Sequence, residues 1–370
     1  MRYSIIALII FNLLVSCKQQ KSEYQALQDI YKKKPSEWVK PWVDSTVTWK
    51  ELGVLPKPNY PNNEKPSKEL LQLGKQLFFD SRLSQTKQFA CVSCHHPIQN
   101  YTDNREKSLG FMLKEGNRNA PTVLNLSYNK HFFWDGRAAS LEEQALGPFQ
   151  NPVEMNTHLD TVVSRVKSIK GYRKVFKNIF NKEDIIIEDI AYAIAMFERS
   201  LISRKSKFDN FLLGKKELDE NELKGLHLFR TKGRCLTCHN GPLFTDNKFH
   251  NLGLTYYGRK FEDLGRYNIT KKKEDVGKFK TPSLRDVMRT GPWMHNGLFG
   301  KMDGILNMYS NGMPRPRRRE HQKNDSLFPT TSPLIQKLDL TEEEKENIIA
   351  FLESLSAPAF RISTPELPKE

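Results

Sequence analysis

Two copies of the pentapeptide C-x-x-C-H carry the most specific chemistry in this 370-residue sequence, at residues 91–95 and 235–239. In this pentapeptide two thiols form thioether bonds to a porphyrin, and the adjacent histidine ligates the iron. The two copies use four of the five cysteines, so the sequence predicts two covalently bound c-type haems. The attachment residues are Cys91, Cys94, Cys235 and Cys238, and the iron ligands are His95 and His239.

The fifth cysteine, Cys17, follows an apolar run that is typical of an export signal. That run is too short to span a bilayer, which takes roughly 20 residues. Leu14-Val15-Ser16-Cys17 is similar to a lipobox, in which the signal is removed ahead of a cysteine that then carries lipid. An ordinary signal peptide with an incidental cysteine is the alternative. We expect residues 1–16 to be a lipoprotein signal peptide and the mature protein to be periplasmic, anchored to the cell envelope through Cys17.

The formal net charge of +15 comes mainly from dispersed lysines. Two interpretations stay open: a solvated surface that keeps the protein soluble, or attraction to an acidic partner or to anionic lipid headgroups. An exported haem protein is not expected to bind nucleic acid.

Most of the sequence after residue 67 has a helical pattern. Ile190, Ile194, Phe197 and Leu201 recur at helical spacing and predict an amphipathic helix. Asp219-x-x-Glu222 and Thr341-x-x-Glu344 are typical capping boxes at helix starts. Alternating strand patterns are scarce, so we predict an all-α fold with long loops.

The chain also repeats itself. A Gly-x-x-Leu-Phe stretch precedes each C-x-x-C-H motif, beginning at Gly74 and at Gly225. Further on, Pro121 precedes Trp134 by the same 13 residues that separate Pro282 from His295. We therefore predict two tandem cytochrome c-like haem domains related by duplication. The expected segments are an N-terminal tether or spacer at 17–66, haem domains at 67–212 and 213–358, and a C-terminal tail at 359–370.

The repeat predicts different environments for the two irons. Fourteen residues beyond His295 stands Tyr309, whereas fourteen residues beyond Trp134 stands Pro148. A phenol oxygen can occupy the remaining coordination position of an iron, whereas a proline side chain has no ligand atom. We expect Tyr309 to ligate the second haem and the first haem to stay open beneath Pro148. Met308, next to Tyr309, remains the alternative ligand.

With these features in view, the chain resembles the bacterial di-haem cytochrome c peroxidases and the related MauG-type enzymes, from about residue 65 to residue 357. The matching stretches are residues 119–125, 133–138, 143–148, 151–155, 281–285 and 292–297. The resemblance implies that the N-terminal haem reacts with hydrogen peroxide. It also implies that the C-terminal haem takes electrons from a small cytochrome c or cupredoxin, and it leaves a homodimer open.

The resemblance also assigns roles to side chains. Glu154 matches the acid–base residue, Gln144 its hydrogen-bonding neighbour, and Trp134 the tryptophan between the haems. Glu154 could instead be only a helix-start carboxylate, and Trp134 only a core residue. Many relatives carry a gating histidine where this chain has Phe111, so we expect a five-coordinate first haem.

A calcium ion is implied at the junction of the domains. Asn119, Thr290 and Pro292 match the positions that supply its oxygen ligands, which suit Ca²⁺. No acidic cluster in the sequence points to this ion without the resemblance.

Three functions compete. The leading one is a peroxidase that reduces hydrogen peroxide to water, and the second is a MauG-type oxidase that modifies side chains of a partner protein. Tyr309 and Phe111 favour the second. The third, a plain di-haem electron carrier, has no use for Glu154 beside an open iron. The arginines at 315, 317, 318 and 319 are either a docking patch for an acidic donor or a solvated loop.

Overall fold

The computed structural model describes residues 22–359 and 362–369, so the predicted signal peptide and Cys17 lie outside the described residues. The described chain is predominantly helical, as predicted. The helices are α2 (Glu23–Tyr31), α3 (Lys68–Phe79), α4 (Cys91–Cys94), α5 (Leu141–Gln150), α6 (Leu159–Ser168), α7 (Lys170–Phe180), α8 (Ile187–Ser200), α9 (Lys207–Leu212), α10 (Glu220–Arg230), α11 (Tyr267–Thr270), α12 (Met302–Ser310) and α13 (Glu342–Ser354).

The all-α prediction missed one small sheet. Strands β1 (Phe249–His250) and β2 (Phe279–Lys280) pair antiparallel, with Phe249 opposite Lys280. Strands of two residues are too short to show an alternating pattern, which explains why the sequence did not reveal them. No helix in the described residues has both the length and the apolar character that crossing a membrane requires.

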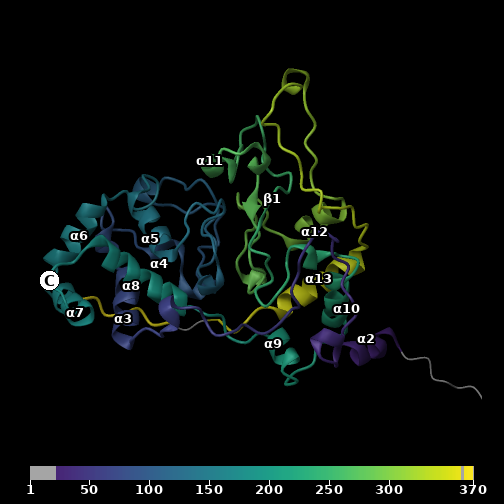
Figure 1. The fold of residues 1–370 in the computed structure, drawn as a ribbon, viewed down its shortest axis with the longest axis horizontal. Helices are drawn as coiled ribbons and strands as arrows, with labels where there is room; N and C mark the ends of the chain where they lie inside the picture. Colours follow the sequence, from purple (N-terminus) through teal and green to yellow (C-terminus); the bar gives the residue numbers. More distant parts are fainter. Residues whose placement is uncertain (1–21, 360–361, 370) are drawn as a thin grey trace, which may run out of the picture.

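The helices form two lobes that lie side by side (Figure 1). The first lobe contains α3 to α8, and the second contains α2 and α9 to α13 with β1 and β2. Each lobe has its own hydrophobic cluster. A long loop at 311–341 extends from the second lobe between α12 and α13, and the side chains of its arginines are exposed.

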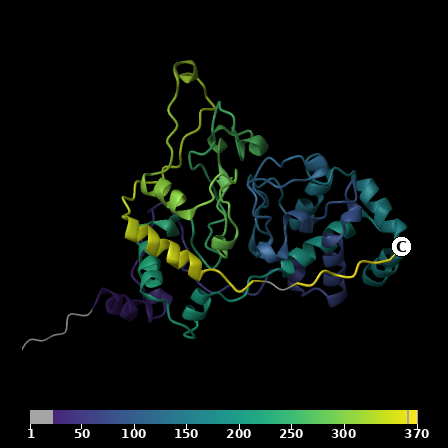
Figure 2. The same cartoon turned by 180° about the vertical axis from the view of Figure 1, so that it is seen from behind.

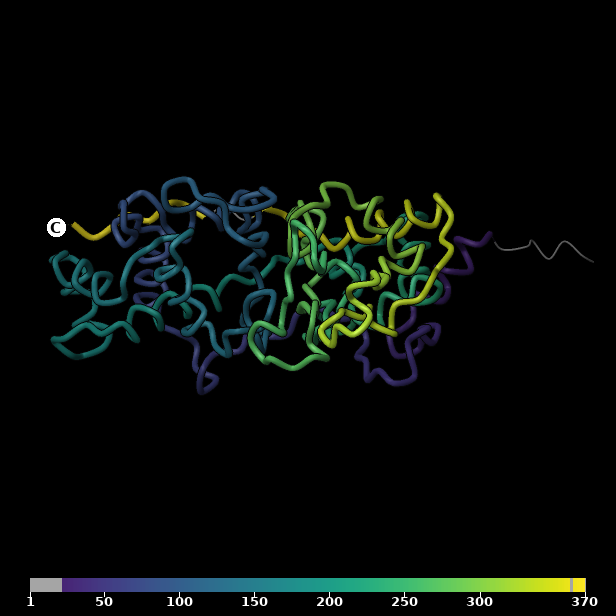
Figure 3. Tube along the Cα trace, turned by 90° about the horizontal axis from the view of Figure 1, so that it is seen from above, coloured from purple at the N-terminus to yellow at the C-terminus, as the bar shows by residue number. Residues whose placement is uncertain are grey.

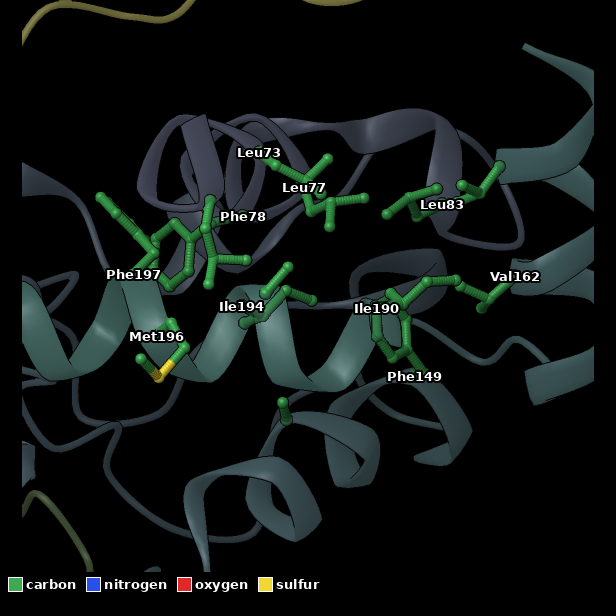
Figure 4. Packing of buried hydrophobic residues seen from close by; sticks show 14 of the residues in the cluster. Leu73, Leu77, Phe78, Leu83, Phe149, Val162, Ile190, Ile194, Met196 and Phe197 are labelled. Atoms are coloured by element: carbon green, nitrogen blue, oxygen red, sulfur yellow. The ribbon is translucent and has the colours of Figure 1, made fainter. Parts of the chain in front are cut away.

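The first core forms where α8 lies against α3. Ile190, Ile194 and Phe197 of the predicted stripe are at most 4% exposed, and they face Leu73 and its neighbours on α3 (Figure 4). At Gly74 an added Cβ would lie 1.9 Å from the carbonyl oxygen of Ala193. Only glycine therefore lets the two helices approach so closely.

The second core repeats this contact between α10 and α13. An added Cβ at Gly225 would lie 1.9 Å from the carbonyl oxygen of Asn347. Both helices begin as predicted: Asp219 and Glu222 form the capping box of α10, and Thr341 and Glu344 that of α13. The sequence therefore predicted the helix starts that set this packing.

The N-terminal segment belongs to the second lobe from the first described residues on. Helix α2 contacts α10, and Tyr31 and Trp38 are buried in the second core with their ring centroids 5.1 Å apart. Helix α9 also packs there through Phe208, although the predicted domain boundary follows it at 212. The described part of the predicted spacer is thus packed on both lobes: Tyr31 and Trp38 lie in the second core, and Tyr60 packs against the first core.

The C-terminal tail crosses back to the first lobe. Figures 2 and 3 show it leaving α13 and ending beside α7. Ile362 packs against the first core, the guanidinium of Arg82 donates to the carbonyl oxygen of Pro368 at 3.1 Å, and Gly171 donates to Lys369. The two chain ends therefore each stabilise the lobe farther from them in sequence.

Candidate haem sites

The proximal histidines of the two motifs are oriented in the same way. Nδ1 of His95 lies 3.1 Å from the carbonyl oxygen of Tyr101, and Nδ1 of His239 lies 3.0 Å from that of Phe244. A ring nitrogen that donates to a carbonyl leaves the other, Nε2, free to ligate a metal. Both imidazoles are therefore positioned as iron ligands.

The surroundings of the motifs fit a covalently bound porphyrin. Burial lowers the pKa of His95 and of His239, which favours the neutral imidazole that binds metal. Burial also raises the pKa of the Cys235 and Cys238 thiols to about 12. All four side chains nevertheless keep part of their surface accessible, as groups that line the space for a cofactor should.

Glu154 lies beside the first motif. Burial raises the pKa of the Cys91 and Cys94 thiols, and the charge of Glu154 raises both further. The side-chain nitrogen of Asn151 donates to Oε1 of Glu154 at 2.6 Å. Burial raises the pKa of Glu154, although this hydrogen bond and the charge of Arg137 both act to lower it. A carboxyl group whose pKa is raised by burial holds a proton more readily than an exposed one, as an acid–base residue requires.

A glycine turn presses against the backbone of Glu154. At Gly110 an added Cβ would lie 2.3 Å from the carbonyl oxygen of Val153. The next residue, Phe111, donates its N–H to the carbonyl oxygen of Glu154 at 2.7 Å. Phe111 thus belongs to the turn that fixes the Glu154 backbone, and its side chain is half-buried.

Helix α5 presents Gln144 and Pro148 one turn apart, on one face. Oε1 of Gln144 is buried and has no hydrogen-bond partner among the described residues. Pro148 lies within the helix and has no N–H to donate to the carbonyl of Gln144. This face therefore offers one free acceptor and no side-chain ligand at Pro148.

Helix α12 follows the second motif along the chain, as α5 follows the first. Each helix follows a loop with a left-handed glycine, Gly136 at φ +70° and Gly297 at φ +68°. Tyr309 lies on α12 as Pro148 lies on α5. Burial raises the pKa of the Tyr309 phenol, and the charges of Cys238 and Cys235 raise it further. The phenol is therefore near the second motif, and Tyr309 and Met308 both pack against the second core.

Trp134 lies at the contact between the lobes. Its Nε1 donates to the carbonyl oxygen of Asn119 at 2.9 Å, and its own carbonyl accepts from the N–H of Lys280 at 2.8 Å. The ring meets that of His295 edge-on, with centroids 6.5 Å apart and planes at 71°. The structure thus brings the predicted inter-haem tryptophan against the second lobe.

Two further polar side chains at this contact, His295 and Lys280, are incompletely paired among the described residues. His295 stacks on Phe279 at 3.6 Å, and its buried Nε2 has no hydrogen-bond partner among the described residues. Burial lowers the pKa of Lys280 to about 8. Its ammonium donates to the carbonyl oxygen of His131, and no carboxylate in the described chain pairs with it. An unpaired cation at this depth fits the carboxylates that a haem carries.

Asn119 joins the first lobe to the loop that contains Thr290 and Pro292. Its N–H donates to the carbonyl oxygen of His295 at 2.8 Å, and its side-chain nitrogen donates to that of Arg105 at 2.9 Å. Thr290 donates its hydroxyl to the carbonyl of Val287. The three predicted calcium residues are thus on neighbouring loops.

One group of three metal-ligand side chains occurs in the described residues: Cys238, Asp246 and His250. Nε2 of His250 lies 2.8 Å from Asp246. Because the haem motif uses Cys238, this group belongs to the surroundings of the second motif and forms no separate metal site.

Sequence reasoning missed Glu198. This residue on α8 is 3% exposed, and its Oε2 has no hydrogen-bond partner among the described residues. Burial raises its pKa to about 8, and its charge in turn raises the pKa of the buried Cys91 thiol. A signal existed, since Glu198 follows Ile194 by four residues and so interrupts the apolar stripe of this helix.

Comparison with known proteins agrees with this geometry. Residues 68–217 match the family described as di-haem cytochrome c peroxidase. Over 302 residues the chain is 36% identical to the methylamine utilization protein MauG of Methylorubrum extorquens, covering 81% of this chain and 82% of that protein. It is 35% identical to the cytochrome c551 peroxidase of Nitrosomonas europaea, covering 81% and 84%.

A solved structure supports the same assignment. The crystal structure of a MauG-like protein associated with microbial copper homeostasis superposes with a TM-score of 0.74 at 31% identity, covering 84% of this chain and 96% of the other. The chain therefore belongs to the family of di-haem cytochrome c peroxidases and MauG proteins, which are oxidoreductases with two c-type haems.

Proposed function

We propose that this protein reduces hydrogen peroxide to water at the haem of the first motif. Electrons enter from a small cytochrome c or cupredoxin through the haem of the second motif. When bound, the haems supply one iron that can accept the oxidant and one that relays electrons. The observation that carries this proposal is the difference between α5 and α12, where Pro148 and Tyr309 occupy corresponding positions.

The two positions differ in what they offer to a metal. The Tyr309 phenol lies near the second motif, and no described residue hydrogen-bonds to its oxygen. That oxygen would be available to hold the iron of the second haem. Pro148 has no donor atom in its side chain, so the space beside α5 is left for a substrate.

Glu154 supplies the proton transfer that cleavage of a peroxide requires. Asn151 holds Oε1, which leaves Oε2 free to take a proton from the bound peroxide and return it to the departing oxygen. The unpartnered Oε1 of Gln144 can accept a hydrogen bond from the same substrate. Trp134, edge-on to His295, provides a π system across the contact between the lobes.

The variant Glu154→Gln tests this assignment. We expect peroxide turnover to fall by ~10²–10⁴-fold, because the amide cannot carry the proton. Both haem spectra should stay unchanged. The matched control is Glu143→Gln, which alters an exposed carboxylate on α5. Equal turnover in the two variants would remove Glu154 from the mechanism.

A second candidate function is MauG-type oxidation of side chains in a partner protein. The placement of Tyr309 near the second motif favours it, since a tyrosine ligand is the pattern that the resemblance associates with MauG-type enzymes. Peroxide consumption in the steady state with a reduced small cytochrome separates the two. Rapid consumption supports the peroxidase, and slow consumption supports protein oxidation.

We also propose that the two haem domains arose by duplication. The same close approach at Gly74 and Gly225 supports this, as do the corresponding loops that precede α5 and α12. A lipid at Cys17 in the periplasm, and a calcium ion near Asn119, Thr290 and Pro292, are further proposals. Mass spectrometry of the mature protein tests the lipid, and elemental analysis tests the calcium.

A further inference from the structure

A cavity of about 610 Å³ lies where the segment after α2 meets the loop between α9 and α10. Five lysines line it together with one carboxylate, Glu217, and these charged residues are exposed. The lysines are Lys32, Lys33, Lys34, Lys215 and Lys216. The cavity exists only because the N-terminal segment packs on the second lobe.

Aromatic side chains that contact one another form the floor of this lysine-lined cavity. Trp38 contributes to it and donates its Nε1 to the carbonyl oxygen of Lys33 at 2.9 Å. The Trp38 ring lies 5.1 Å from that of Tyr31 and 6.5 Å from that of Phe211. Lys33 and the loop after α9 are therefore attached to rigid, buried rings.

The charge at the rim is not balanced from within the protein. The ammonium of Lys32 lies 3.9 Å from Glu217, and both side chains are more than half exposed, so this pair is weak. The other four lysines have no ion-pair partner in the described part of the chain. Five ammonium groups thus face one carboxylate. Such a site recognises anions, and its apolar floor favours an anion attached to apolar groups.

Leu213 adds an apolar contact at the same place. It stands between two lining residues, Leu212 and Gly214, and is 41% exposed. Lys215 and Lys216 follow it by two and three residues, and an exposed leucine near lysines is typical of segments that lie in the interface of a membrane. Helices α2 and α9 both lie at the edge of the second lobe that faces away from the loop at 311–341 (Figure 1).

We propose that this edge docks on an anionic phospholipid membrane, with headgroup phosphates in the lysine-lined cavity and Leu213 at the acyl boundary. The sequence fits this placement. Ser22 caps α2 and follows Cys17 by five residues, which span at most ~18 Å. If the proposed lipid anchor is present, it holds the cavity close to the membrane surface.

The test uses the mature holoprotein with both haems, exported behind a signal that leaves no lipid. The site variant replaces four lysines of the rim by glutamine: Lys33, Lys34, Lys215 and Lys216. The matched control replaces four exposed lysines of the first lobe: Lys87, Lys130, Lys170 and Lys174. Binding is measured by cosedimentation with vesicles of phosphatidylglycerol and phosphatidylcholine, or of phosphatidylcholine alone, with and without added inorganic phosphate.

Each lysine near an anionic surface strengthens binding about five-fold. We therefore expect the site variant to lose ~10²–10³-fold in affinity for the anionic vesicles and the control to lose less than ~10-fold. Peroxide turnover should be unchanged in both. Equal losses in the two variants would show that only net charge matters. Binding that inorganic phosphate abolishes at millimolar concentration would indicate a site for the free anion. Either result overturns membrane docking.

Because the assay protein lacks lipid, these outcomes are independent of the anchor at Cys17. They are also independent of the peroxidase assignment, since the cavity is formed by residues that have no part in the haem sites.

Discussion

Glu198 places a carboxyl group inside the packed helices of the first lobe. It directly precedes Arg199, whose guanidinium pairs with Glu142 at 2.6 Å. Glu198 itself keeps a buried oxygen without a partner. Burial favours its neutral form, which explains the raised pKa of about 8.

This raised pKa predicts a pH-dependent contribution to stability. In the unfolded chain a glutamate titrates near 4.3, so from about pH 4.3 to 8 the folded state binds more protons than the unfolded state. The free energy of unfolding should therefore fall as the pH rises through that range. The neutral variant Glu198→Gln avoids this loss and should gain ~1–3 kcal/mol on the natural protein between pH 5 and pH 9.

Chemical denaturation of the holoprotein at several pH values measures this difference. Glu188→Gln, an exposed carboxylate on the same helix, is the control and should show no such trend. A difference between Glu198→Gln and the natural protein that does not change with pH would contradict the prediction.

At the scale of elements, the proposed difference between the two haem sites depends on Pro148 of α5 and Tyr309 of α12. Tyr309→Phe removes the only oxygen of that side chain while keeping its ring. We expect the second haem to lose an axial ligand and change from low spin to high spin, as seen by electron paramagnetic resonance. Met308→Leu is the matched control and should leave the spectrum unchanged. The reverse pattern would identify Met308 as the ligand.

Local sequence patterns predicted α8, α10 and α13, but α2 lies in the segment that we expected to be a tether or spacer. The capping boxes of α10 and α13 satisfy backbone groups within one turn, so a few adjacent residues specify them. The pairing of β1 with β2 was missed because each strand is two residues long. The partner-free Nε2 of His295 and the unpaired Lys280 were missed because contacts between distant segments create them. Spacing predicted the haem attachment residues, whose chemistry is local to each motif.

At the scale of the whole molecule, Arg118 connects the two lobes. Its guanidinium lies 2.6 Å from Asp263 of the second lobe and 2.6 Å from Asp135 of the first. Asp135 is 4% exposed. Without Arg118, Asp135 would keep Arg137 as its partner. Asp263, whose side chain is 18% exposed, would have no cationic partner among the described residues. A largely buried carboxylate that loses its cationic partner is costly, because its charge stays desolvated without compensation.

Arg118→Gln should therefore lower the free energy of unfolding of the holoprotein by about 2 kcal/mol, with a lower Tm in calorimetry. The control is Arg137→Gln, since Arg137 also pairs with Asp135 but its side chain is 39% exposed. We expect less than ~1 kcal/mol there. Equal effects would mean that the bridge to Asp263 does not stabilise the contact between the lobes.

The crossing of the chain ends determines the order in which each lobe can be finished. Residues near the start, such as Tyr31 and Trp38, are available before the second core exists. The contacts of Arg82 and Gly171 with Pro368 and Lys369 can form only after residues 368 and 369 have been synthesised. The surface of the first lobe around Arg82 and Gly171 is therefore the last to be covered, although most of that lobe is synthesised first. If the gene were split between the two lobes, the second lobe would lack the N-terminal segment with Tyr31 and Trp38. The first lobe would lack the C-terminal tail with Pro368 and Lys369.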